Sequence, residues 1–187
     1  MTPLAPDLWL WEGQEDSQAR QELVRAHLAG LVGCPPAELH LTRDAMGRPH
    51  IAAPDCGLHF SLARRGGMMV MAVSREGLVG VDLEVPTPDG DWPEAVAKDF
   101  FAPAEYRWLR GLPKAERGAA FLRLWTAKEA VLKALGLGIA QGMAEPCLTG
   151  LDLAAEEIQS LQAHGRHFSL RWLPLKDGLI CLARATV

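Results

Sequence analysis

The chain has 187 residues, a formal net charge of −4 and 49% hydrophobic residues. These totals suit one compact domain or two small fused lobes, and the acidic balance argues against a general nucleic-acid-binding surface. Four scattered cysteines without a C-x-x-C pair indicate reduced structural thiols rather than a zinc or redox site. No apolar run reaches membrane-spanning length and the start lacks a signal-like core, so we expect a soluble, cytoplasmic protein without a membrane partner.

The first half of the chain predicts one helix followed by short strands. Apolar spacing and closing glycines predict the helix over residues 17–32. Residues 39–51 are typical of two strands around a turn at Gly47. Three further strand patterns joined by glycine-containing turns favour an antiparallel meander. They cover residues 58–64, 68–74 and 76–85.

The second half begins with a proline- and acid-rich stretch, "VPTPDGDWP" (85–93), which is the best linker candidate. Helical patterns occupy most of residues 93–138, and strand patterns then flank a hairpin signal at Asp177-Gly178. The order of elements predicts an α+β fold of two pseudo-symmetric lobes, each with helices packed on a small, mostly antiparallel sheet. We place these lobes at residues 1–85 and 86–187.

Two acids stand out in the strand pattern "EGLVGVDLEV" (76–85). Asp82 and Glu84 are two residues apart, so their side chains project from the same face of the strand. Neighbouring carboxylates raise each other's pKa unless a cation lies between them. A solvated edge strand would explain the pair without a ligand, and a bound cation is the alternative.

A third acid lies in the helical pattern "LWTAKEAVLKALGLG" (124–138). Glu129 and Lys133 are four residues apart and share a helix face with Trp125. They could form an ordinary exposed ion pair. Combined with Asp82 and Glu84, however, Glu129 completes an oxygen-only set suited to Mg²⁺. A lysine one turn further on suits a phosphate held by that metal, which favours phosphoryl chemistry.

These motifs, in this order, resemble those of a known family. "GVDLE" (80–84) comes some forty residues before "WTAKEAVLKALGLG" (125–138), and "DFFAPAEYRWL" (99–109) lies between them. The set resembles the 4′-phosphopantetheinyl transferases, in their larger monomeric type that modifies acyl and peptidyl carrier proteins. The resemblance extends over residues 23–142. It implies the fold of that family, a monomer that binds coenzyme A in the cleft between its two lobes.

The resemblance implies an Mg²⁺-dependent enzyme that transfers 4′-phosphopantetheine from coenzyme A to a carrier-protein serine and releases 3′,5′-ADP. Asp82, Glu84 and Glu129 would hold the metal, and Glu129 would also be the best candidate for general base. Lys133 would neutralise charge on the departing nucleotide. With Asp82, these two residues form the catalytic set implied by the resemblance.

Further basic residues are implied as contacts to coenzyme A. Lys128 would help to hold the pyrophosphate, and Arg48, in "GRP", would lie near the adenosine phosphates. Arg25 matches a position that is often basic in relatives, although a solvated arginine on a helix face is an equal alternative. Carrier proteins are acidic around the modified serine, so a docking surface of apolar and basic residues is expected, and residues 107–117 are our candidate.

The chain departs from the family pattern in two places. Relatives carry a Ser-His pair that touches the 3′-phosphate of coenzyme A, where "HFSLARRGG" (59–67) has Ala63 and Arg64. We expect Arg64, with Arg65 as second choice, to replace that pair as a phosphate ligand; a basic surface turn is the alternative. The stretch "WLWEGQEDSQAR" (9–20) is acidic where relatives are often basic.

Two other functions remain open from the sequence. A non-catalytic or weakened homologue would bind coenzyme A or a carrier protein without turnover. An unrelated Mg²⁺-dependent phosphohydrolase would need an activated water, and no motif supports it. The residues do not specify which carrier protein or pathway is served.

Overall fold

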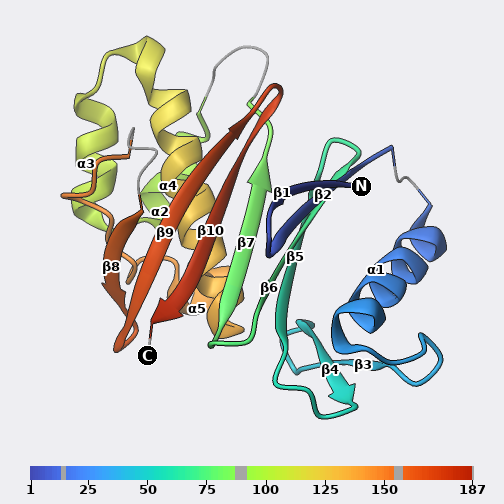
Figure 1. Ribbon diagram of the computed structural model, residues 1–187. Coiled ribbons are helices and arrows are strands. Elements are labelled where there is room, and N and C mark those ends of the chain that lie inside the picture. Colours follow the sequence, from blue (N-terminus) through green and yellow to red (C-terminus); the bar gives the residue numbers. More distant parts are fainter. Residues whose placement is uncertain (14–15, 87–91, 154–157, 187) are drawn as a thin grey trace.

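The computed structural model describes residues 1–13, 16–86, 92–153 and 158–186, and its helices and strands form two halves around antiparallel sheets (Figure 1). Residues 87–91 of the predicted linker lie outside the described residues. The first sheet has the strand order β1-β2-β6-β5, and the second has the order β7-β10-β9-β8. A hairpin of β3 and β4 forms a third, two-stranded sheet. The α+β class predicted from the sequence is confirmed.

The elements of the first half are β1 (Thr2–Ala5), β2 (Leu8–Glu12), α1 (Ser17–Val32), β3 (His40–Arg43), β4 (Pro49–Ala53), β5 (His59–Arg65) and β6 (Met68–Ser74). Helix α1 has the predicted bounds because both of its ends are capped. The Asp16 carboxylate accepts a hydrogen bond from the Ala19 amide at 2.6 Å, and Gly33 closes the helix in the left-handed conformation at φ 82°.

The remaining elements are β7 (Val79–Glu84), α2 (Glu94–Phe100), α3 (Pro103–Gly111), α4 (Lys114–Leu135), α5 (Ile139–Gly142), β8 (Gln159–Ala163), β9 (Arg166–Leu175) and β10 (Gly178–Thr186). The long helix α4 packs on β7 and β10 and supplies much of the larger apolar core. Figure 1 shows α1 on one side of the molecule and α2 to α4 on the other, with both sheets between them. No helix in the described ranges is long and apolar enough to cross a membrane.

The pairing of β7 differs from the predicted meander. This strand is hydrogen-bonded to β10, with Asp82 opposite Cys181, and not to β6. Its link to the first sheet includes a hydrogen bond from the Val81 amide to the Ser61 hydroxyl at 3.1 Å, and a shared apolar cluster that contains Val70 and Ile180. The predicted lobe boundary at residue 85 remains a prediction, but by hydrogen bonding β7 belongs to the sheet of the second half.

Candidate functional site

The acidic strand β7 lies directly against helix α4 because Gly80 allows the two backbones to touch. A Cβ atom at Gly80 would lie 1.9 Å from the carbonyl oxygen of Ala130 and 2.5 Å from the amide nitrogen of Ala134. Both are main-chain atoms, so no side-chain movement could make room. The contact brings the strand's two acids next to Glu129 and Lys133 on the facing helix.

Asp82 and Glu129 each keep one buried oxygen without a partner. Lys133 Nζ lies 2.6 Å from Asp82 Oδ1, and the Asp82 side chain is only 6% exposed. The other oxygen of Asp82, Oδ2, is buried without a hydrogen bond, and Glu129 Oε1 is in the same state. Buried polar atoms in native proteins are nearly always satisfied. Two such carboxylate oxygens in one cluster therefore indicate a site that receives a ligand.

Glu84, the third carboxylate, already has partners. Arg65 Nε lies 3.0 Å from Glu84 Oε2, and the Trp125 side chain also hydrogen-bonds to Glu84. Burial raises the pKa of Glu84, and the negative charge of Asp82 raises it further, while Arg65 acts in the opposite direction. Glu84 and Asp82 are thus close enough to repel each other.

The pKa of Glu129 is affected by the charges of both other acids, Asp82 and Glu84. Burial raises its pKa, Lys133 opposes that shift, and the charges of Asp82 and Glu84 add to it. Oxygen donors, repelling charges and two unpartnered oxygens are the properties of a site for a hard divalent cation. As the side chains stand, no group of three or more His, Cys, Asp or Glu residues in the described part is arranged so that it could hold a metal ion.

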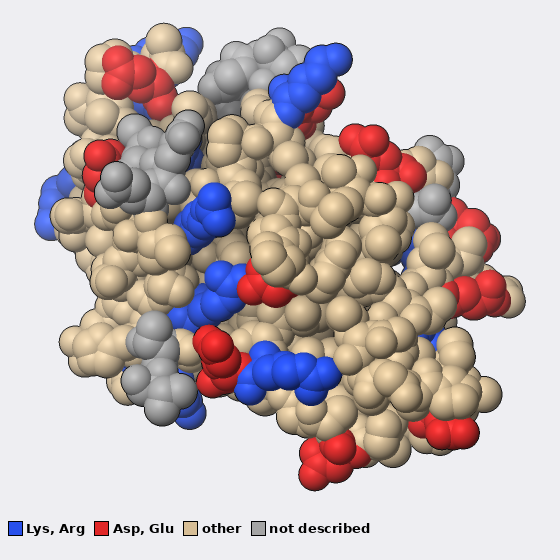
Figure 2. Space-filling model, in the orientation of Figure 1, with Lys and Arg blue, Asp and Glu red and all other residues tan. Residues whose placement is uncertain are grey.

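A basic pocket of about 570 Å³ adjoins this cluster, lined by parts of α1, the β3–β4 hairpin, β5 and the end of α4. The basic side chains that line it are Arg20, Arg25, Arg43, Arg48, Arg64 and Lys133. No Asp or Glu is among the described residues of the lining. On the face drawn in Figure 2, by contrast, acidic and basic side chains are interspersed and form no patch of one sign. Lys133 belongs to both the pocket and the carboxylate cluster.

Three predicted nucleotide contacts, Arg25, Arg48 and Arg64, therefore line one pocket. Arg48 Nη1 donates to the carbonyl oxygen of Ala134 at 2.7 Å, which ties the β3–β4 hairpin to α4. Burial lowers the pKa of Arg48, although a guanidinium keeps its charge in proteins. Arg25 Nη1 donates to the carbonyl oxygen of Leu39 at 2.7 Å.

Two basic residues of the pocket were not predicted, Arg20 and Arg43. A signal for Arg20 was present in the sequence, because it lies four residues before Val24 and so shares a face of α1 with it; Val24 also lines the pocket. The signal for Arg43 is its alternation with Leu41 in β3, since residues two apart share a strand face.

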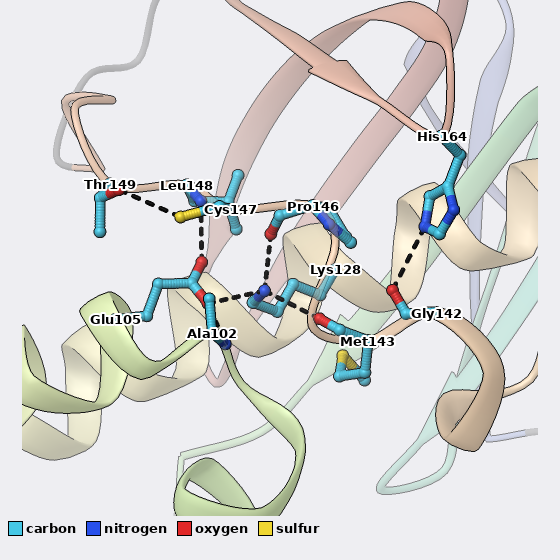
Figure 3. A network of polar contacts seen from close by, with 10 residues as sticks. All are labelled: Ala102, Glu105, Lys128, Gly142, Met143, Pro146, Cys147, Leu148, Thr149 and His164. Atoms are coloured by element: carbon cyan, nitrogen blue, oxygen red, sulfur yellow. Dashed lines mark hydrogen bonds and ion pairs between the residues drawn. The ribbon is translucent and has the colours of Figure 1, made fainter.

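Lys128 lies elsewhere, in a closed network of polar contacts (Figure 3). Its side chain is fully buried, with Nζ 2.8 Å from Glu105 Oε2 and donating to the carbonyl oxygens of Met143 and Pro146 at 2.9 and 2.6 Å. All three N–H groups of the ammonium are therefore used. This placement speaks against the predicted pyrophosphate contact, because Lys128 points about 100° away from Glu129 around the helix.

The network around Lys128 also explains the buried acid of α3. Glu105 Oε2 accepts from the Ala102 amide at 3.0 Å, and Glu105 Oε1 accepts from the Leu148 amide at 2.8 Å. The ion pair therefore joins α3, α4 and the segment that follows α5. Burial lowers the pKa of Lys128, and Glu105 opposes that shift. These two residues support the fold, and neither of them lines the pocket.

Comparison with known proteins shows the family of the chain. The chain matches the 4′-phosphopantetheinyl transferase superfamily over residues 78–181, more than half of its length. It is 37% identical over 125 residues to the 4′-phosphopantetheinyl transferase HetI of Nostoc sp., which covers 66% of this chain and 52% of that protein. A 4′-phosphopantetheinyl transferase of Bacillus subtilis is 32% identical over 118 residues, covering 63% and 50%.

The chain belongs to the 4′-phosphopantetheinyl transferase superfamily. This confirms the family resemblance inferred from its three motifs. The chain spans about half the length of the curated relatives that it matches.

Proposed function

We propose that this protein transfers 4′-phosphopantetheine from coenzyme A to a serine of an apo acyl or peptidyl carrier protein. The observation that carries the proposal is the position of Lys133. This residue is paired with the unsatisfied carboxylate cluster and also lines a pocket whose charged side chains are all basic. A pocket for a polyanion beside a site for a hard cation suits the pyrophosphate of coenzyme A.

The pocket would hold the nucleotide through its arginines. Arg48 and Arg25 are anchored by main-chain carbonyl groups, so their guanidinium groups are positioned before a ligand arrives. Arg64 is exposed in the pocket wall and would take the 3′-phosphate in place of the family's Ser-His pair. Arginine binds phosphate with two parallel hydrogen bonds, which makes this replacement chemically reasonable.

Asp82, Glu84 and Glu129 would hold Mg²⁺, and their oxygen-only donor set fits that ion. When bound, the metal would neutralise charge on the pyrophosphate. Glu129 has a buried, unpartnered oxygen that could accept the proton of the carrier serine. Lys133, which is paired with Asp82 and lines the pocket, would compensate charge on the departing 3′,5′-ADP.

The acidic carrier protein would meet the exposed side of α3. Trp108 is 40% exposed there, and the neighbouring side chains Arg107 and Lys114 are also exposed. Exposed aromatic and arginine side chains are typical of protein interfaces. All four cysteines are free thiols, which is compatible with the cytoplasmic location that we propose for this enzyme. We also propose that it acts as a monomer.

A second function is a homologue that binds coenzyme A or a carrier protein without turnover. Ala63 and Arg64 favour it, because they replace the family's usual 3′-phosphate contacts.

The test is a transfer assay with coenzyme A, Mg²⁺ and a panel of apo carrier proteins, read by intact-protein mass spectrometry. We expect at least one carrier to gain one phosphopantetheine group, and chelation of the metal to abolish the gain. Binding of coenzyme A without transfer to any carrier in the panel would refute the proposal and support the binding function. The matched control is the same carrier with its acceptor serine replaced by alanine.

A further inference from the structure

The two consecutive arginines at the end of β5 serve different sites. Arg64 lines the basic pocket, whereas Arg65 is not in its lining and instead pairs with Glu84, with 3.0 Å between Nε and Oε2. Alternation along the strand explains this division, because adjacent side chains point to opposite faces. The "ARR" stretch (63–65) therefore contributes one cation to the nucleotide pocket and one to the carboxylate cluster.

The main chain around Arg65 holds it in this position. The β5–β6 turn is made by Gly66 and Gly67, both left-handed at φ 56° and 76°. The Gly67 carbonyl oxygen accepts a hydrogen bond from the Gly13 amide at 3.1 Å. On its other side the turn adjoins the end of β7, since a Cβ atom at Gly66 would lie 3.4 Å from Val85 Cγ2.

The exposure of the pair allows it to open. The Arg65 side chain is 58% exposed and that of Glu84 is 17% exposed. The guanidinium can therefore move into water at small cost, while the carboxylate stays in place. Partly exposed ion pairs are weak, so another cation can displace such a partner.

We propose that Arg65 is a built-in competitor of the divalent metal at Glu84. This inference rests on the proposed function, because it treats Glu84 as a metal ligand. Lys133 compensates Asp82 and Arg65 compensates Glu84, so the protein's own cations occupy two of the three acids. Arg65 must leave Glu84 before Oε2 can bind a metal, and its charge also repels the arriving ion. The metal affinity of the cluster is therefore lower than its carboxylates alone would give.

The test measures metal binding by the purified protein without substrates. Mn²⁺ is titrated and the free ion is followed by electron paramagnetic resonance, and Mg²⁺ is titrated by calorimetry. Arg65→Ala should lower the dissociation constant about two- to five-fold, the range that the loss of a partly exposed ion pair supports. Arg166→Ala removes an exposed arginine on β9 and is the matched control for net charge. It should leave the dissociation constant unchanged.

A double variant separates competition from a general effect of charge. In the Glu84→Gln background, the competing pair is absent, so Arg65→Ala should lose most of its effect on metal binding. Arg65→Gln keeps a polar, hydrogen-bonding side chain, although a shorter one, without the charge. It should behave like Arg65→Ala, and agreement between the two variants excludes a local folding defect as the cause.

The outcomes separate this inference from the proposed function. Metal binding by Arg65→Ala that is no tighter than that of the wild type, including absence of binding by both, would overturn the inference. If the wild type transfers phosphopantetheine under that outcome, the proposed function still stands. If Arg65→Ala binds metal more tightly but no carrier is ever modified, the competition stands and the transferase proposal fails.

Discussion

Lys128 and Glu129 are neighbours in the chain, yet they belong to two polar clusters of opposite kinds. Around Lys128, each N–H group has an acceptor, and Glu105 accepts from two main-chain amides as well. Around Glu129, the cluster keeps two buried oxygens without any partner. A cluster in which every polar group is already paired adds rigidity but has no donor or acceptor left to bind a ligand. A cluster with unpaired buried groups lowers the stability of the fold, but those groups can still bind a ligand.

The largest expected effect comes from opening the closed cluster. Lys128→Met should lower the free energy of unfolding by about 3–5 kcal/mol, because it leaves Glu105 as a buried, unpaired charge. Urea denaturation measures the change. Adding Glu105→Gln should recover part of it, since no buried charge then remains. Near-wild-type stability of Lys128→Met would contradict the structural role of this pair.

Removing a charge from the open cluster should affect activity instead. We expect Asp82→Asn to fold normally but to transfer phosphopantetheine at least about 100-fold more slowly, as expected when a group that stabilises charge is lost from a reacting centre. The rate is measured with a modified carrier, and circular dichroism checks the fold. Asp55→Asn, at an exposed position, is the control and should retain full activity. Equal activities would refute the role of Asp82.

Removing a basic side chain from the pocket should lower the affinity for coenzyme A. Arg64→Ala should raise the KM for coenzyme A about tenfold, the value of one charge-assisted hydrogen bond to phosphate. It should change the KM for dephospho-coenzyme A little, because that substrate has no 3′-phosphate. Equal effects on both substrates would mean that Arg64 does not contact the 3′-phosphate.

Glu129→Gln should give a smaller effect, of opposite sign, on stability. The raised pKa of Glu129 means that the folded state disfavours its ionised form, a penalty that is present at pH 7 and is lost as the pH falls through the folded-state value. The neutral amide removes this penalty, so we expect a gain of about 0.5–1 kcal/mol in the metal-free protein together with loss of transfer. Thermal unfolding at pH 7 and at low pH measures it. A gain that persists at a pH well below the ordinary pKa of a glutamate, where both states are protonated, would exclude this cause.

The smallest expected effect concerns His27, which also has a buried nitrogen without a partner, Nε2. Its ring packs edge-on against Trp9 and Trp11 at centroid distances of 4.5 and 5.4 Å. Burial lowers the pKa of His27, so the unfolded chain takes up the proton first as the pH falls below about 6.5. Stability should therefore decrease from pH 7 to pH 5.5, by less than about 1 kcal/mol, and the decrease should be smaller in His27→Gln. An unchanged pH profile in that variant would assign the decrease to other groups.

Much of the fold and of the site was accessible from the sequence because it depends on local spacing. The bounds of α1 follow from its apolar period and its caps, and the adjacency of Glu129 to Lys133 follows from the helical repeat. The pairing of β7 with β10 was not accessible, because the strands are distant in the chain and share no local signal. Helical geometry turns the Lys128 side chain away from that of Glu129. Only the tertiary structure shows that the Lys128 side chain then meets Glu105 of α3.

The contact at Gly80 has a consequence for how this site can vary. The distance between the two acids of β7 and Glu129 of α4 depends on two main chains in contact. No side chain lies between them that repacking could enlarge or shrink. One added methyl group at residue 80 would widen the gap between the proposed metal ligands without touching any of them. A substitution there should abolish the proposed transfer as a change to Asp82 or Glu129 should, although its cause would be steric and would act through the main chain. The width of the proposed cation site therefore depends on the absence of a side chain at residue 80.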